Sequence, residues 1–418
     1  MDAFDKVTAT ILKKNKVTHK EYTTILNKID GFMHDLRKGL EMEKIEAYVM
    51  LGGSAAKGTF VKHDFDCDIF IRFMYDTYKD KDISELLEKA LKKAAIKHER
   101  VHGSRDYFIG IWKNLHFEAI PVLFITNPAQ AKNITDMSPL HVEWLNQHIT
   151  EELRDQILLT KLFFKAQKIY GAESYMNGFS GHIVDILTTY YGTFKSLLEN
   201  AIKWREKELI NITPHLITAS DLNPDKITSA IIVIDPIQKE RNAAAAVGFE
   251  QFYHLKNQAA EFLEAPSLSH FKRKPVKLAD IKNKGNTVII IKALPLKGKL
   301  DTIGTKIYKV LEFIAEELQR NDFTVLEKGW DWPEDPDTEA LLWIVVKEKE
   351  LPIVKEQMGP PVKLQKDAVA FEEKHKKTFF KDERVYALVK RKYITPLSFV
   401  KHLLLDKRIK EKARKWKL

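Results

Sequence analysis

The sequence contains a single cysteine, Cys67, among 418 residues. One thiol excludes intramolecular disulfides and any zinc site built from several cysteines, and it is typical of a reducing compartment. Acidic residues are also in deficit, since 58 Asp and Glu face 68 Lys and Arg, for a formal net charge of +10. A cationic surplus of this size favours a polyanionic partner, most simply nucleic acid. A solvated, lysine-rich surface of the kind found in thermophiles is the alternative explanation.

Long apolar runs are missing as well. No run approaches the ~18 residues of a membrane span, and the apolar stretch at 341–346 is short and flanked by charge. Residues 1–6 contain no apolar signal core. We therefore expect a soluble, cytoplasmic chain that does not bind membranes. With 44% hydrophobic residues it is long enough for two or three domains with real cores.

The first third of the chain predicts a mixed sheet with helices packed on it. Residues 1–48 read as two helices, and a charged helical stretch follows at 82–97. Short apolar strands are expected at 45–51, 67–73, 107–112 and 116–123. Ser138-Pro139 predicts a helix start, with Ser138 as N-cap and Pro139 at the first helical position.

The remainder divides into a helical part and an α+β part. Residues 139–265 are predicted to be mostly helical, with one strand at 230–234. Pro266, Pro275 and the basic run at 272–274 mark a boundary. Beyond it we expect a strand at 287–293, a helix at 303–320, a strand at 341–346 and a basic C-terminal helix over 406–418.

The segment 51–73 carries most of the functional information. Gly52-Gly53-Ser54 forms a turn in which glycine lets the backbone approach a phosphate, and Ser54 and Lys57 add a hydroxyl and a cation. The strand that follows presents acids two residues apart on one face, namely Asp64, Asp66 and Asp68. Carboxylates are ligands that Mg²⁺ prefers. A lone Asp-x-Asp is more often a solvated strand face, but the adjoining turn favours metal-assisted transfer of a nucleotide from its triphosphate.

A third carboxylate is expected on a neighbouring strand, and Glu118 is the candidate. It lies between Phe117 and Ala119, so it is either a surface residue of an alternating strand or a partner of Asp66 and Asp68. In the second case it could ligate a metal and take the proton from an incoming hydroxyl.

Taken together, these residues resemble the archaeal, class I CCA-adding enzymes, which are tRNA nucleotidyltransferases of the polymerase-β superfamily. The resemblance begins in the signature at 53–59 and in Asp66-x-Asp68. It continues through the segments at 136–145, 169–173, 177–182, 191–192, 234–244 and 264–272. It is good from about residue 45 to 275 and weaker beyond, where Met358-Gly359-Pro360 is familiar.

The resemblance implies addition of C, C and A to the 3′ end of tRNA from CTP and ATP, with Mg²⁺ and without a nucleic-acid template. It also implies a role for each matching residue. The metals would be held by Asp66, Asp68 and Glu118. The nucleotide would be held by Gly53, Ser54 and Lys57, its triphosphate by His141, Lys161 and Tyr170, and its base would lie near Arg241.

The residues themselves support several of these roles. His141 falls in the first turn of a helix, where the local dipole favours a phosphate. Lys161 and Tyr170 are nine residues apart, so both can touch one ligand only if the helix ends or bends before Tyr170, as Gly171 suggests. Arg241 could equally cap a helix or pair with Asp235.

The sequence departs from the family pattern at three of these positions. The family usually has Glu where this chain has Asp66, and Asp where it has Glu118. Both changes keep oxygen ligands, so we expect metal binding to survive. Lys57 stands where Arg is frequent, which gives a point charge instead of a bidentate fork.

We therefore predict an α+β, multidomain protein, a monomer or homodimer. A nucleotidyltransferase head would span 1–139, a helical neck 140–268, and a body and tail that bind the tRNA acceptor and TΨC arms 269–418. Two alternatives stay open. One is a poly(A)-type, oligoadenylate-type or partial (CC- or A-only) nucleotidyltransferase. The other is a catalytically dead tRNA-binding protein, although all the expected acids are present.

Overall fold

The computed structural model describes the whole chain except residues 1, 63–66, 214–217, 219–220, 223 and 283–285. The chain forms two compact units, 1–274 and 275–418, each with its own core. Both combine helices with sheets, which confirms the predicted α+β class. In the described part of the chain, no helix is long and apolar enough to cross a membrane. The finer division of the chain at residues 139 and 268 stays a prediction.

A five-stranded sheet organises the beginning of the first unit, in the order β1-β2-β5-β4-β3. Its strands are β1 (Ala47–Leu51), β2 (Cys67–Met74), β3 (Glu99–Val101), β4 (Tyr107–Trp112) and β5 (Leu115–Phe124). Neighbours are antiparallel except β2 and β5, which run parallel. The four strands expected from the sequence are confirmed, and the short edge strand β3 is additional.

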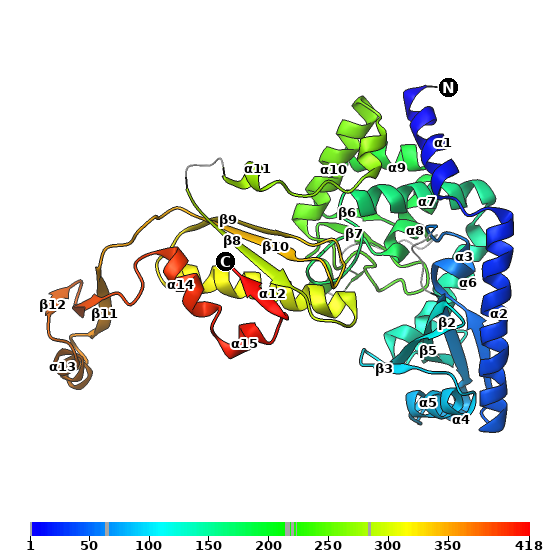
Figure 1. The fold of residues 1–418 in the computed structure, drawn as a ribbon, viewed down its shortest axis with the longest axis horizontal. Coiled ribbons are helices and arrows are strands. Elements are labelled where there is room, and N and C mark those ends of the chain that lie inside the picture. The colour runs from blue at the N-terminus through cyan, green and yellow to red at the C-terminus, as the bar shows by residue number, and fades with distance from the viewer. Residues whose placement is uncertain (1, 63–66, 214–217, 219–220, 223, 283–285) are drawn as a thin grey trace. The chain divides into compact units, whose positions relative to one another are not determined.

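The two faces of this sheet differ because side chains alternate along each strand. Cys67, Ile69 and Ile71 of β2 are fully buried against helices on one face. That face is covered by α2 (His19–Met42) and α5 (Ile83–Lys93), with α4 (Tyr75–Tyr78) following β2 (Figure 1). The opposite face carries α3 (Gly53–Lys57) and α6 (Ser138–His148), where Val142 packs on Phe70. The acids of β2 and β5 belong to this second face.

The rest of the first unit is a helical bundle around a phenylalanine-rich core. Its helices are α1 (Ala3–Asn15), α7 (Glu151–Ala166), α8 (Gly181–Tyr191), α9 (Phe194–Ala201) and α10 (Phe249–Glu264). Phe163, Phe194 and Phe262 pack together at ring-centroid distances of 5.4 to 5.9 Å. The expected strand is β7 (Ile231–Val233), and a second strand, β6 (Glu208–Ile210), pairs with it in parallel. Short 3₁₀ turns complete the unit at Pro128–Gln130, Ile134–Met137, Pro224–Lys226 and Leu268–Phe271.

The second unit contains two sheets. One has the order β14-β8-β10-β9 and the other β11-β13-β12. The strands are β8 (Thr287–Leu294), β9 (Val325–Asp331), β10 (Ala340–Val346), β11 (Val354–Pro361), β12 (Thr378–Lys381), β13 (Arg384–Lys390) and β14 (Lys415–Lys417). The helices are α11 (Leu278–Lys282), α12 (Leu300–Arg320), α13 (Gln365–Lys374), α14 (Pro396–Leu403) and α15 (Lys407–Lys410). The expected strand, helix and strand are confirmed as β8, α12 and β10.

Two local predictions were wrong. The basic C-terminus is not one helix, because after α15 it becomes β14 and adds to the edge of β8, with Trp416 opposite Ala293. Ser138 is not an N-cap, because the 3₁₀ turn at Ile134–Met137 runs directly into α6 and Ser138 is already helical. The cap of that turn is Asn133, whose side chain accepts a hydrogen bond from the Thr135 amide.

Candidate functional site

Two carboxylates lie next to each other on the open face of the first sheet. Asp68 of β2 and Glu118 of β5 are direct partners in the parallel register. Register partners in a parallel pair project to the same face, so both acids point away from the core that buries Cys67 and Ile69. Both are half-buried. The sheet therefore brings together two acids that are fifty positions apart in the sequence.

The glycine-serine turn lies against Asp68. The Gly52 amide donates to the Asp68 carbonyl at 2.7 Å, which ties the start of α3 to β2. Gly53 has φ +54°, and a Cβ atom there would lie 1.6 Å from Asp68 Oδ2. Only glycine allows this approach of a backbone to a carboxylate. Ser54 follows on the first turn of α3, and Lys57 is the last residue of this helix.

Asp64 and Asp66 lie outside the described residues, so the predicted role of Asp66 rests on the sequence alone. Asp68 is the first acid of the motif that the structure describes, one residue into β2.

Three helices meet at another carboxylate, Asp185 of α8. Lys57 Nζ of α3 donates to Asp185 Oδ2 at 2.7 Å, and Lys161 Nζ of α7 lies 3.1 Å from Asp185 Oδ1. Lys161 also donates to Thr59 Oγ1 at 2.8 Å. The Asp185 side chain is 1% exposed. The structure thus brings together the two lysines that were predicted to bind the nucleotide, through an acid that was not predicted.

Burial sets the electrostatics of this cluster. It lowers the pKa of Lys161, and the charge of Lys57 lowers it further, whereas Asp185 opposes both effects. Burial also acts to raise the pKa of Asp185, but the two ammonium groups outweigh it and hold that pKa below its usual value. The cluster is therefore held together by charge pairing in a low-dielectric environment.

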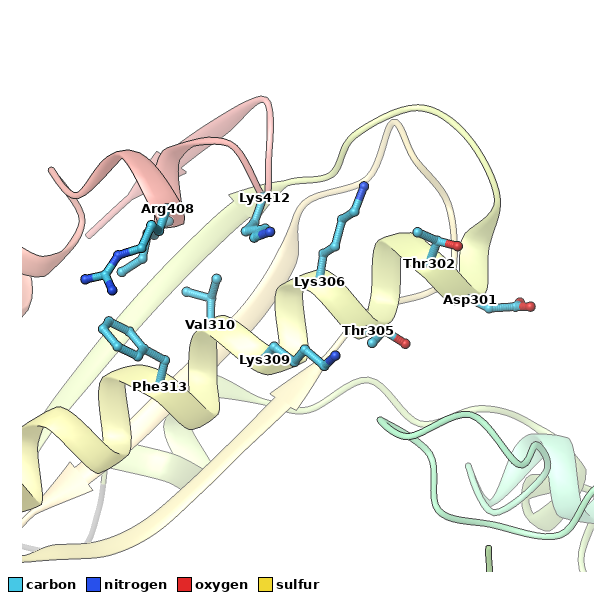
Figure 2. Close-up of a pocket in the computed structure, with 10 residues that line it drawn as sticks. Asp301, Thr302, Thr305, Lys306, Lys309, Val310, Phe313, Arg408 and Lys412 are labelled. Carbon is cyan, nitrogen blue, oxygen red and sulfur yellow. The ribbon is translucent and has the colours of Figure 1, made fainter. Parts of the chain in front are cut away.

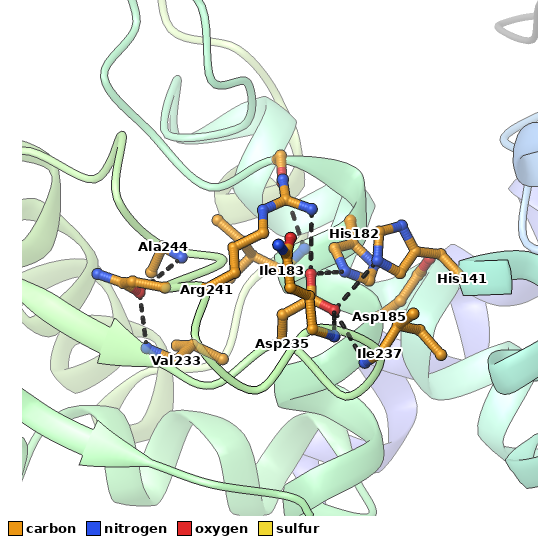
Figure 3. Close-up of polar contacts among 12 residues, drawn as sticks. His141, His182, Ile183, Asp185, Val233, Asp235, Ile237, Arg241 and Ala244 are labelled. Atoms are coloured by element: carbon orange, nitrogen blue, oxygen red, sulfur yellow. Dashed lines mark hydrogen bonds and ion pairs between the residues drawn. The ribbon is translucent and has the colours of Figure 1, made fainter. Parts of the chain in front are cut away.

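Asp235 joins two further predicted residues, His141 and Arg241 (Figure 3). Its Oδ1 accepts from His141 Nε2 at 3.1 Å, while Oδ2 is 3.2 Å from His182 Nε2 and 3.1 Å from the Arg241 guanidinium. Oδ1 also accepts the amides of Ile237 and Gln238. Of the two local alternatives for Arg241, the structure shows the pairing with Asp235.

The two imidazoles contact each other at the Asp235 cluster, with ring centroids 4.0 Å apart and ring planes tilted by 34°. Burial lowers the pKa of His182 to about 4, although Asp235 favours the charged form. Burial acts to raise the pKa of Asp235, but hydrogen bonds from His141 and His182 outweigh it and leave that pKa well below its usual value. His182 is thus a neutral donor to a carboxylate anion at neutral pH.

Tyr170 lies just beyond the end of α7, as the spacing required. That helix ends at Ala166, and Gly171 follows Tyr170 with φ +122°. Tyr170 pairs with Phe179 in an isolated parallel bridge, and its ring faces Lys165 Nζ at 5.1 Å. A Cβ atom on Gly181 would be 2.7 Å from the Tyr170 hydroxyl, so this hydroxyl reaches the start of α8.

Two groups of residues offer donor atoms that could hold a metal ion. Asp68 and Glu118 supply adjacent carboxylate oxygens on one face, which fit a hard divalent ion. The ligand atoms of His141, His182 and Asp235 also lie within 4.8 Å of one another. However, Asp235 already accepts two amides, two imidazoles and a guanidinium, and the positive Arg241 opposes a cation. This second group is explained by its hydrogen bonds.

Asp185 and His182 are the residues whose contacts sequence reasoning missed. They are three positions apart on α8 and therefore share one face of it. Asp185 stands alone as an acid between Val184 and Ile186, both fully buried. A single charge in such an apolar run was the available signal, because a buried carboxylate needs a partner.

In the second unit, a basic pocket of about 580 Å³ opens between α12 and α15 (Figure 2). Its cationic side chains are Lys306, Lys309, Arg408 and Lys412. Arg408 is paired with Asp406 at 2.7 Å. The hydroxyls of Thr302 and Thr305 lie along the same side of α12. Cations and hydroxyls in this combination suit phosphate oxygens.

Comparison with known proteins was made by sequence and by structure. The family model described as tRNA nucleotidyltransferase, second domain, matches residues 155–272, and that of the CCA-adding enzyme, C-terminal domain, matches residues 285–413. The CCA-adding enzyme of Nanoarchaeum equitans is 31% identical over 350 residues, covering 82% of this chain and 84% of that protein. That of Methanothermobacter thermautotrophicus is 27% identical over 408 residues, covering 94% and 87%. Among solved structures, the Cid1 poly(U) polymerase superposes with a TM-score of 0.51 at 13% identity, over 65% of this chain and 99% of that one, which supports the fold alone.

Proposed function

This chain belongs to the archaeal CCA-adding enzymes, and from that premise we propose that it extends the 3′ end of tRNA by C, C and A, using CTP and then ATP. The observation that carries the proposal is the pair Asp68 and Glu118, registered on one sheet face beside Gly53. A nucleotidyl transfer needs such acids next to a turn that can receive a triphosphate.

In the proposed reaction the 3′-hydroxyl oxygen of tRNA attacks the α-phosphorus of the nucleotide. The bond between α-phosphorus and the bridging oxygen to the β-phosphate breaks, and pyrophosphate leaves. Glu118 orients the hydroxyl and accepts its proton. Asp66 and Asp68, with Glu118, would hold two Mg²⁺ ions, which when bound neutralise charge on the phosphates.

The remaining predicted residues are proposed to hold the nucleotide. Gly53 and Ser54 offer backbone amides and a hydroxyl close to Asp68, and Lys57 ends the same short helix. His141 lies on α6, Lys161 on α7 and Tyr170 just after α7, and all three would meet the triphosphate. Arg241, fixed by Asp235, would lie near the base.

The second unit is proposed to bind the acceptor and TΨC arms of tRNA. The basic pocket of α12 and α15 supports this role, because its lysines and hydroxyls match phosphate oxygens and carry no sequence preference. Binding that relies on such contacts weakens steeply as salt rises.

End-addition tests this function directly. Protein, Mg²⁺ and a tRNA transcript ending at the discriminator base are given CTP, ATP or both, and product length is read at single-nucleotide resolution. Two additions with CTP alone, and a third only with ATP, are expected. A ladder of A residues would indicate a poly(A)-type enzyme. Addition of only the two C residues, or of only the A, would indicate a partial enzyme. If tRNA is bound but not extended, the protein is a catalytically dead tRNA-binding protein.

Asp68→Asn tests the assigned chemistry. It removes one charge without changing shape, and we expect end-addition to fall by at least about 100-fold while tRNA remains bound. Asp76→Asn is the matched control, because this carboxylate is 96% exposed just beyond β2 and lies 3.9 Å from Lys79 Nζ. Full activity of a folded Asp68→Asn protein would contradict the assignment.

A further inference from the structure

Asp185 is the buried acid that no part of the reaction above uses. It lies on α8, between Lys57 of α3 and Lys161 of α7. Asp185 is 1% exposed and Lys161 is 4% exposed, so neither charge is solvated by bulk water. The carboxylate is therefore the main counter-ion available to both ammonium groups.

The charges of this cluster do not cancel. Among the described residues, two lysines share one carboxylate, which leaves one surplus positive charge in a largely buried position. Lys165 on α7 adds to the repulsion on Lys161. The uncharged contact is Thr59, whose hydroxyl accepts from Lys161 at 2.8 Å. Without Asp185, Lys161 would face Lys57 and Lys165, and among the residues that the structure describes Asp185 is the carboxylate that offsets them.

The cluster also adjoins the turn that receives the nucleotide. Lys57 belongs to the five-residue helix that begins at Gly53, against Asp68. Arg154 of α7 donates to the Lys57 carbonyl at 3.1 Å and closes the end of this helix. The position of Lys57 is thus set from both ends, by Arg154 at its backbone and by Asp185 at its ammonium group.

We propose that Asp185 is a positioning residue for the nucleotide triphosphate: it keeps Lys161 in its ammonium form and aligns Lys57 and Lys161 behind the phosphates. The proposal rests on the proposed function, because it presumes that a nucleotide triphosphate enters beside Gly53. The surplus charge then has a purpose, since a polyanion arriving there completes the neutralisation that one carboxylate leaves unfinished.

The test measures CTP binding to the full chain with Mg²⁺ and without tRNA, by equilibrium dialysis between pH 6 and pH 9.5. Binding of CTP should weaken at high pH as Lys161 loses its proton. In Asp185→Asn, we expect this alkaline weakening to begin at least about one pH unit lower, because loss of the anion favours the neutral amine. Affinity at pH 8 should fall roughly ten-fold or more.

Two variants serve as controls. Asp185→Glu keeps the charge, so the fall in CTP affinity at high pH (the alkaline limb of the binding curve) should return to its wild-type pH. Asp155→Asn removes an acid of α7 that pairs with Lys16 on the surface, and it should leave CTP binding unchanged. A purely structural role for Asp185 would lower thermal stability in Asp185→Asn without moving the limb, and that result would overturn the proposal.

A second variant covers the case in which Asp185→Asn does not fold. Lys161→Met leaves Lys57 and Asp185 as a one-to-one pair, so no buried charge is orphaned. We expect it to bind CTP at least about ten-fold more weakly at pH 7 and to lose the alkaline limb. Wild-type affinity with an unchanged limb would refute the proposal. CTP binding without any end-addition by the wild type would instead refute the proposed function, so the two failures are distinguishable.

Discussion

Gly53 offers a sharp test of how closely the turn and the carboxylate depend on each other. A Cβ atom at this position would lie 1.6 Å from Asp68 Oδ2 and 3.1 Å from Asp68 Cβ. In Gly53→Ala the Asp68 Oδ2 atom has to retreat by roughly 2 Å to reach ordinary contact distance. Turning about the Asp68 side-chain bonds provides most of this movement, and Asp68 Cβ, at 3.1 Å, has to give by only a small amount.

The two consequences of this substitution differ in size. The backbone at φ +54° costs an alanine about 1 kcal/mol, which corresponds to a fall in Tm of about 2–4 °C for a unit of this size. A catalytic carboxylate displaced by more than 1 Å costs about 100-fold in rate. We therefore expect Gly53→Ala to lower kcat for CTP addition by about 100-fold while the protein stays folded.

Gly192→Ala is the matched control. Gly192 has φ +77° and ψ −34° at the end of α8, and apart from its own chain neighbours no described atom lies within 4 Å of the Cβ it would acquire. This backbone lies outside the left-handed helical region, so alanine costs at least as much there as at Gly53, but no carboxylate is displaced. Thermal melting should show a fall in Tm in Gly192→Ala at least as large as in Gly53→Ala, and single-turnover addition of CTP should show a rate loss in Gly53→Ala alone. Equal rates in both would refute the argument that Gly53 exists to admit Asp68.

Two further predictions concern the buried polar networks. The pKa of His182 is about 4 in the folded protein and 6.5 in a free histidine, so the unfolded chain takes up the proton first as the pH falls. The contribution of His182 to the free energy of unfolding is therefore full above pH 6.5. It falls by about 3 kcal/mol as the pH drops toward 4. His182→Gln should remove this part of the pH dependence in denaturant titrations at pH 7 and 4.5, and an unchanged acid slope would contradict it. Arg105→Ala should cost about 3 kcal/mol, since Asp136 is fully buried and pairs with both terminal nitrogens of Arg105. Chemical denaturation measures this loss, and Arg105→Lys should recover part of it. A loss below about 1 kcal/mol would contradict the prediction, because it would mean that the hydrogen bonds from three backbone amides to Asp136 are sufficient to stabilise the buried carboxylate.

Sequence reasoning was most successful where local pattern determines structure. Strand alternation correctly assigned Cys67 and Ile69 to the core and Asp68 to the other face. The nine-residue separation of Lys161 and Tyr170 required a helix end between them, and α7 ends at Ala166. These features depend on backbone geometry and on hydrophobic periodicity, which neighbouring residues determine.

Local pattern was insufficient where a distant segment supplies the partner. Ser138 and Pro139 form a common helix start, yet the preceding 3₁₀ turn makes Ser138 helical. The basic C-terminus has helical composition, but its last residues join the edge of β8, more than a hundred positions earlier. Edge pairing satisfies backbone groups of β8, and composition does not report that opportunity.

The sequence by itself therefore determined the turn at Gly53, the strand that carries Asp68 and the family to which the chain is similar. Only the tertiary structure decided which buried acids pair with which side chains. Asp185 meets Lys57 across 128 positions, and Asp235 meets His141 across 94. The physical reason is that a buried charge must be paired, while the identity of its partner depends on how helices pack and not on any local propensity.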